Sequence, residues 1–105
     1  MSKPMYIDYA SITELDLSNQ QLDVLPDLSM YTNLKELTCN CNNLTTLDNL
    51  PDSLIELSCN NNKLTSLDNL PSNLEILYCS GNPFIYDFKP TLENIKNYNA
   101  TKVLQ

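Results

Sequence analysis

Apolar positions recur along the middle of the chain with a period of twenty residues. Residues 34–53 (LKELTCNCNNLTTLDNLPDS) align without a gap to residues 54–73 (LIELSCNNNKLTSLDNLPSN). Both blocks carry Leu, Leu, Cys, Asn and Leu at matching positions, and both contain a Leu-Asp-Asn-Leu-Pro run. A fixed period of this length is typical of a solenoid, in which each unit buries its apolar side against its neighbours.

Within each block a short stretch alternates between polar and apolar residues, as in residues 56–60 (ELSCN). This alternation predicts a β-strand with one buried face. The rest of the block has to return the chain to the next strand, and it contains the pair Leu50-Pro51 or its repeat. Because the residue before a proline favours an extended conformation, we expect extended or short 3-10 returns rather than α-helices.

The same pattern can be followed over residues 12–88, with its matching blocks at 12–22, 34–44, 54–64 and 74–84. The first unit is longer by two residues, which fall within 29–32. Gln20 stands where the other units have Asn. Residues 1–11 match no repeat position, and we expect them to cap the N-terminal end of the core.

The repeat pattern ends at Asp87, which occupies a position held by leucine in the second and third units. Pro90 suits the first turn of a helix, and apolar residues spaced by three follow it, so a short amphipathic helix is predicted over 89–98. We expect the helix to close the C-terminal end, with Phe84, Tyr86 and Phe88 packed beneath it. The alternative is an aromatic binding pocket. Residues 99–105 are expected to form a tail.

The pattern LxxLxLxxNxL, in which Cys replaces the third Leu, resembles that of the leucine-rich repeat family over roughly residues 12–88. The short unit with Leu-Pro in its second half looks like the repeats of bacterial effector proteins. The run LYCSGNP at 77–83 is similar to leucine-rich repeat proteins of giant DNA viruses of amoebae. The resemblance implies a curved parallel sheet whose concave face is the usual contact surface. We therefore expect a leucine-rich repeat solenoid, α/β by convention, with a short helical cap.

Charge and composition narrow the function. The chain has thirteen carboxylates against six lysines, a net charge of -7, and no arginine. Binding to a phosphate backbone needs clustered positive charge, so this balance argues against nucleic acid and anionic membranes as partners. The absence of histidine removes the commonest general base and the usual nitrogen ligand of zinc. We expect a non-enzymatic protein without a metal or cofactor.

The sequence also bears on the compartment. No stretch approaches eighteen apolar residues, so no membrane span is expected. The start of the chain lacks a continuous apolar segment after Lys3, so it does not read as a secretory signal. Four cysteines that we expect to remain unpaired suit a reducing compartment. We therefore expect a cytoplasmic protein, in its own cell or in a host cell.

Three of the cysteines, Cys39, Cys59 and Cys79, occupy one inward column of the expected sheet. Thiols pack as small hydrophobes, so these residues are expected to fill the core. A disulfide or a zinc site is the alternative. Adjacent strands hold such a column about 4.8 Å apart, whereas a disulfide brings Cβ atoms to about 3.8 Å and zinc needs four ligands around a point. Cys41 lies beyond the strand, where the next units have Asn61 and Gly81, and is expected to be a free thiol outside this column.

Asn42, Asn62 and Asn82 recur at the point where each unit turns after its strand. A carboxamide both donates and accepts hydrogen bonds, so it can satisfy backbone groups of the adjacent unit. An unsatisfied buried group of this kind costs about 1 to 3 kcal/mol. We interpret the three residues as a structural ladder rather than as catalytic groups.

The return segments carry a second polar cluster, with Asp48, Asn49 and Asp52 in one unit and Asp68 and Asn69 in the next. Such a cluster raises calcium as an alternative. Its spacing fits no EF-hand loop, which needs a glycine and a closing glutamate. Turn chemistry explains Asp and Asn before Leu-Pro equally well.

The outward positions of the strands are the best candidates for recognition, and the face they form changes from acidic at its N-terminal end to apolar and aromatic at Ile76 and Tyr78. Stacked carboxylates beside polar rows are what a partner bearing Lys or Arg would recognise, with Glu36 and Glu56 steering it and Tyr78 as the anchor. The alternative is a merely solvated face. The candidate binding residues are Glu14, Asp16, Glu36, Thr38, Glu56, Ser58, Asn60, Ile76 and Tyr78.

The function expected is a protein–protein interaction module that binds a basic protein through the concave face of the solenoid. One alternative is a structural repeat protein that self-associates, because so few repeats leave a core end incompletely covered, which allows a monomer or a weak homodimer. Another alternative is the substrate-recognition part of a larger effector or ubiquitin-ligase system, whose chemistry would lie elsewhere.

Overall fold

Each repeated unit contains a strand of three residues, because polar and apolar residues alternate there and one face can be buried. The computed structural model describes residues 6–103. Over this range the chain forms a 3-10 helix, four strands and one α-helix, in the order η1 (Tyr9–Ser11), β1 (Glu14–Asp16), β2 (Glu36–Thr38), β3 (Glu56–Ser58), β4 (Ile76–Tyr78) and α1 (Leu92–Val103).

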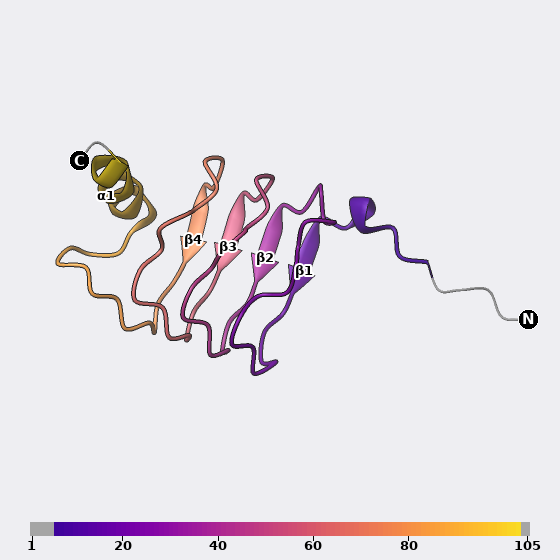
Figure 1. Ribbon diagram of the computed structural model, residues 1–105, viewed down its shortest axis with the longest axis horizontal. Coiled ribbons are helices and arrows are strands. Elements are labelled where there is room, and N and C mark those ends of the chain that lie inside the picture. The colour runs from indigo at the N-terminus through magenta and orange to yellow at the C-terminus, as the bar shows by residue number, and fades with distance from the viewer. Residues whose placement is uncertain (1–5, 104–105) are drawn as a thin grey trace, which may run out of the picture.

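The four strands form one open parallel sheet in the order β1-β2-β3-β4, with α1 beyond the β4 end (Figure 1). The register pairs each inward leucine with its repeat equivalent, so that Leu15, Leu37, Leu57 and Leu77 lie in one row. Strands β2, β3 and β4 follow one another at intervals of twenty residues, as the sequence period predicts. The arrangement belongs to the α/β class.

The core is a continuous cluster of leucines contributed by strands and returns. In the second and third units, Leu37 and Leu57 on the strands and Leu44 and Leu64 after them are at most 1 % exposed. The equivalent leucines of the first unit are only partly buried. The N-terminal end of the core is therefore less well covered than its middle.

The returns between the strands contain turns and extended segments, and no helix interrupts them within residues 12–88. A tight turn brings the chain into each new unit, with Leu54 N donating to Pro51 O at 3.2 Å and Leu74 N donating to Pro71 O at 3.1 Å. Of the two forms expected for the returns, the extended one is found.

Helix α1 begins and ends later than the sequence predicts. The Thr91 hydroxyl accepts a hydrogen bond from Asn94 N at 3.1 Å, so Thr91 caps the helix and Pro90 precedes the cap rather than opening the first turn. The helix continues past residue 98 to Val103, and residues 99–103 are helical instead of forming a tail. Residues 104–105 lie outside the described range.

The C-terminal end of the core is closed by aromatic rings and by side chains of α1. The rings of Tyr86 and Phe88 stack at 4.6 Å, and Tyr98 of the helix packs on both at 5.5 Å. Lys96 Nζ donates to Leu74 O at 2.8 Å, so the helix also satisfies the backbone beneath it. In these contacts the aromatic side chains pack against one another at the C-terminal end of the core.

The N-terminal end carries the 3-10 helix η1, in a segment that the sequence predicts as a cap. Tyr9 packs edge-on against Tyr31 at 5.1 Å, and Asn33 Nδ2 donates to Ala10 O at 2.8 Å. Tyr6 remains 90 % exposed, so the segment before η1 does not cover the first unit. The part of the expected cap at residues 1–5 lies outside the described range.

Candidate binding face

The outward side chains of the four strands form one surface, here called the open sheet face. Its first row follows the register Glu14, Glu36, Glu56 and Ile76, and its second row follows Asp16, Thr38, Ser58 and Tyr78. The structure thus brings eight of the nine candidate binding residues together on the strands. Their charge is concentrated toward β1, and the exposed apolar groups lie on β4, with Ile76 at 40 % and Tyr78 at 53 % exposure.

Glu36 lies between two other carboxylates of the first row. The charge of Glu14, then partial desolvation, then the charge of Glu56 raise the pKa of the Glu36 carboxyl above its ordinary value. Like charges on adjacent strands disfavour ionisation of the group between them. A cationic group placed over this row would relieve the repulsion that the three carboxylates create.

Asp16 has a different environment from the glutamates beside it. Its Oδ1 accepts a hydrogen bond from Ser18 N at 2.9 Å. This bond, together with that of the Ser18 hydroxyl, lowers the pKa of the Asp16 carboxyl. Asp16 therefore keeps its negative charge more firmly than Glu36, although one of its oxygens is engaged by the backbone.

The third row, which includes the candidate Asn60, is occupied by bonds between units. Asn40 Oδ1 accepts hydrogen bonds from the Ser58 hydroxyl and from Asn60 N, both at 2.8 Å. Asn60 Oδ1 in turn accepts from Ser80 N at 2.7 Å. Sequence reasoning missed this structural role of Ser58 and Asn60, although the twenty-residue spacing of Asn40 and Asn60 was the available signal.

A groove of about 430 Å³ adjoins the aromatic end of the open sheet face. It lies between Tyr78 on β4 and the segment that leads into α1, where Lys89 and Pro90 form its other wall. The sequence does not single out Lys89 or Pro90 as neighbours of Tyr78, because both lie outside the repeats. The groove lining is Asn60, Leu77, Tyr78, Cys79, Ser80, Lys89, Pro90, Thr91 and Leu92.

The asparagine ladder runs behind the strands and links each unit to the one before it. Asn62 Oδ1 accepts from Asn42 N and Leu44 N, and Asn62 Nδ2 donates to Cys39 O at 3.0 Å. Asn42 and Asn82 make the same set of bonds to their preceding units. Between units, these side chains bond only to the unit that precedes their own. The first unit has no such unit before it within residues 6–103, so Gln20 does not have to make the bonds that the asparagines make.

The cysteines divide into three buried residues and one exposed residue, all with free thiols. Cys39, Cys59 and Cys79 lie in the core, and burial raises the pKa of each, to about 12 for Cys39. Cys41 is exposed and has a φ of 58°, a left-handed conformation that Asn61 shares at the equivalent place. The buried thiols therefore pack as core residues, and Cys41 is the accessible one.

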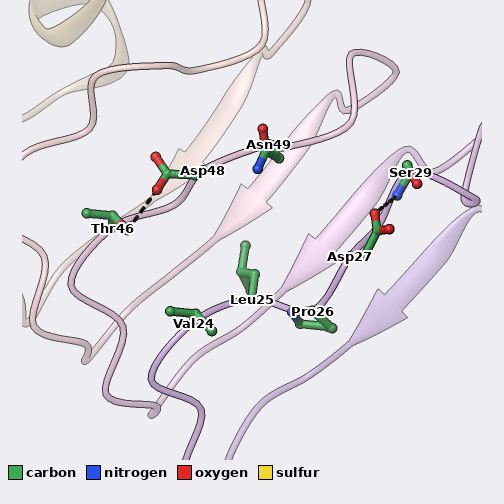
Figure 2. Close-up of a pocket in the computed structure, with 8 residues that line it drawn as sticks. All are labelled: Val24, Leu25, Pro26, Asp27, Ser29, Thr46, Asp48 and Asn49. Atoms are coloured by element: carbon green, nitrogen blue, oxygen red, sulfur yellow. Dashed lines mark hydrogen bonds between the residues drawn. The ribbon is translucent and has the colours of Figure 1, made fainter.

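A second groove, of about 580 Å³, lies on the return side between the first and second units. Figure 2 shows Asp27 and Asp48 on its two walls, with Asp27 Oδ1 accepting from Ser29 N at 2.9 Å and Asp48 accepting from the Thr46 hydroxyl. These carboxylates are used in local turn bonds. Among residues 6–103, no three His, Cys, Asp or Glu side chains gather closely enough to hold a metal ion.

Comparison of the chain with protein-family models, with curated proteins and with solved structures finds no match. Over the described part of the chain, no helix has the length and apolar character needed to cross a membrane.

Proposed function

We propose that the chain is a small leucine-rich repeat solenoid whose open sheet face corresponds to the family's concave surface and binds a basic protein. The twenty-residue strand spacing, the single row of inward leucines and the backward asparagine ladder support this assignment. In this proposal the protein has no catalytic role of its own, and recognition is its activity.

The observation that carries the proposal is the unbroken row of Glu14, Glu36 and Glu56, which leads to β4, the strand that carries exposed Tyr78. The raised pKa of Glu36 reflects repulsion along this row, which a lysine or arginine side chain would offset. Tyr78 offers a large amphipathic surface at the other end, a residue type enriched among interface hot spots. Charge would steer the partner, and the aromatic end would hold it.

The proposed setting is a reducing compartment such as the cytoplasm. Four free thiols support it, because an exposed thiol such as that of Cys41 is readily oxidised in an oxidising compartment. Within the described residues the leucine cluster packs without a disulfide.

The experiment is affinity capture from cell extract with three immobilised proteins: the wild type, E36Q/E56Q and D48N/D52N. Both double variants remove two carboxylates, but only the first pair lies on the open sheet face. Basic proteins retained by the wild type and by D48N/D52N should be lost with E36Q/E56Q and at high salt. Tyr78→Ser should weaken retention without changing its salt dependence.

Two results would contradict the proposal. Equal retention by all three proteins at low salt would remove the acidic row from recognition. Equal loss with both double variants would mean that net charge alone, rather than the open sheet face, governs capture.

A further inference from the structure

The outer edge of β1 presents backbone hydrogen-bonding groups that no part of residues 6–103 covers. Thr13 O accepts from Glu36 N at 3.0 Å, and Leu17 N donates to Thr38 O at 2.7 Å. The backbone N–H and C=O groups of the odd-numbered residues in and beside β1 therefore point toward β2. Because successive residues of a strand direct their N–H and C=O groups to opposite sides, those of Glu14 and Asp16 face outward. β1 is the end strand of the sheet, and the chain before η1 leads away from it (Figure 1).

The ladder of side-chain bonds also ends at this edge. In the second, third and fourth units the third-row N–H is satisfied by the preceding unit, as when Asn60 N donates to Asn40 Oδ1. Ser18 has no preceding unit, and its N–H is satisfied by the carboxylate of Asp16 instead. At this edge the backbone N–H of Ser18, just beyond the strand, thus has a hydrogen-bond partner. The outward backbone groups of Glu14 and Asp16 have none within residues 6–103.

The core beneath the edge is partly uncovered. Leu15 and Leu17 of the first unit are only partly buried, whereas Leu37 and Cys39 at the equivalent places are 1 % and 0 % exposed. Leu22 and Leu25, on the return of the first unit, are likewise only partly buried. A further strand beside β1 would therefore bury apolar surface as well as pair with the backbone.

The charge around the edge defines which strand would fit. Residues 6–28 contain five carboxylates and no lysine, at positions Asp8, Glu14, Asp16, Asp23 and Asp27. Charged side chains on an edge strand act against pairing with a like-charged copy. An antiparallel pair of β1 strands centred on Leu15 would set Glu14 opposite Asp16 of the other copy. A second copy of this chain is thus disfavoured, and a basic strand is favoured.

We propose that the outer edge of β1 binds an extended basic peptide segment as a fifth strand. The segment places Lys or Arg beside Glu14 and Asp16 on the open sheet face, and apolar residues beside Leu15 and Leu17 over the core. Its pattern is therefore basic–apolar–basic–apolar. Main-chain bonds supply part of the affinity, and the alternating side chains supply the specificity.

This edge site is separate from the positions of Glu36 and Glu56, and different variants test the two sites. Glu14→Gln removes a charge from the edge. Glu14→Pro removes an outward N–H, a change that edge strands tolerate because no bond to the neighbouring strand is lost. E36Q/E56Q leaves the edge unchanged.

The test is an amide-resolved NMR titration with the synthetic peptide Thr-Lys-Leu-Lys-Leu-Ser. Two control peptides keep its length: Thr-Glu-Leu-Glu-Leu-Ser reverses the charge, and Thr-Lys-Lys-Leu-Leu-Ser keeps the composition but breaks the alternation. With peptide at about ten times its Kd, exchange of the Glu14 and Asp16 amides should slow roughly tenfold, while the amides of β4 should not respond.

The variants sharpen the expected result. Glu14→Gln should weaken peptide binding by up to roughly fivefold, the upper limit expected for one exposed ion pair. Glu14→Pro should abolish binding while the rest of the amide spectrum stays dispersed, and E36Q/E56Q should bind as the wild type does.

Three results would overturn the proposal. The first is no protection at Glu14 and Asp16 in the presence of the peptide. The second is a response centred on Glu36, Glu56 and Tyr78, which would assign the basic peptide to the open sheet face alone. The third is protection of the Glu14 and Asp16 amides in the absence of peptide, if it increases with protein concentration. That result would assign the edge to a second copy.

Discussion

The side chain of Asn62 closes the turn of the preceding unit by accepting the backbone N–H of Asn42 at 3.2 Å. Asn62 is only 7 % exposed, and it also accepts from Leu44 N and donates to Cys39 O. Its Nδ2 also donates to Cys59 O of its own unit at 3.2 Å, so one carboxamide satisfies backbone groups of two successive units. The cohesion of the units depends on these bonds as well as on the leucine core.

Asn62→Ala should lower the free energy of unfolding by more than about 2 kcal/mol, because several buried groups lose partners worth roughly 1 to 3 kcal/mol each. Asn61→Ala is the matched change one residue away. Asn61 is exposed and has a φ of 59°, so alanine there costs about 1 kcal/mol of backbone strain. Urea unfolding measures both variants, and equal midpoints would contradict the ladder.

The thiols should react with alkylating reagents in two classes. Cys41 is exposed, whereas Cys39, Cys59 and Cys79 are buried with raised pKa values. At pH 8 the folded protein should take up one label per molecule, at Cys41, and Cys41→Ser should abolish this fast labelling. Mass spectrometry with and without urea makes the measurement, and fast labelling of Cys59 in the folded state would be the contrary result.

The periodic part of this fold could be predicted from the sequence, since identical residues at one spacing must occupy identical environments. The row of Leu37 and Leu57 and the links made by Asn42 and Asn62 follow from the twenty-residue period. The same period also predicts the neighbours along the open sheet face. For this face, the period predicts which residues lie side by side. It does not predict that the face binds a partner, which stays a proposal.

The features that sequence reasoning missed arise where the period ends or where a bond depends on local geometry. The start of α1 is set by the Thr91 hydroxyl rather than by Pro90, which propensity favours. The bond from Ser18 N to the Asp16 carboxylate is specific to the first unit, because the other strands carry Thr, Ser or Tyr at that place. The left-handed conformation of Cys41 is also not expected from cysteine itself, and is indicated only by Asn19, Asn61 and Gly81 at the equivalent places.

The C-terminal cap makes a prediction about Tyr86. Its hydroxyl accepts a hydrogen bond from Leu67 N, on the return of the third unit, at 2.8 Å. Tyr86→Phe should keep the stacked rings but leave Leu67 N without its acceptor, at a cost of about 1 to 3 kcal/mol in the free energy of unfolding. Thermal and urea unfolding measure the loss.

Tyr78→Phe is the matched control for the cap, because Tyr78 is exposed on β4. Removal of its hydroxyl should change stability by less than about 0.5 kcal/mol, as is usual for surface positions. Losses of the same size for Tyr86→Phe and Tyr78→Phe would show that the bond to Leu67 does not stabilise the cap.

The acidic row predicts that Glu36→Gln stabilises the folded protein at neutral pH. Glu14, partial desolvation and Glu56 raise the pKa of Glu36 in the folded state, so the folded state binds its proton more tightly than the unfolded state does. The stability that protonated Glu36 contributes is present below its unfolded pKa and is lost as the pH rises through its folded pKa. Glutamine cannot ionise, so the variant does not undergo this loss.

The gain in stability from Glu36→Gln should therefore be small near pH 3, grow above about pH 4.5 and level off by pH 7. Urea unfolding over this pH range measures it, with Glu75→Gln as the control because Glu75 precedes β4 and lies outside the row. Salt should reduce the gain, since exposed charges are screened. A gain independent of both pH and salt would come from glutamine's packing rather than from relief of repulsion, and the acidic row would then hold no strain for a cationic partner to relieve.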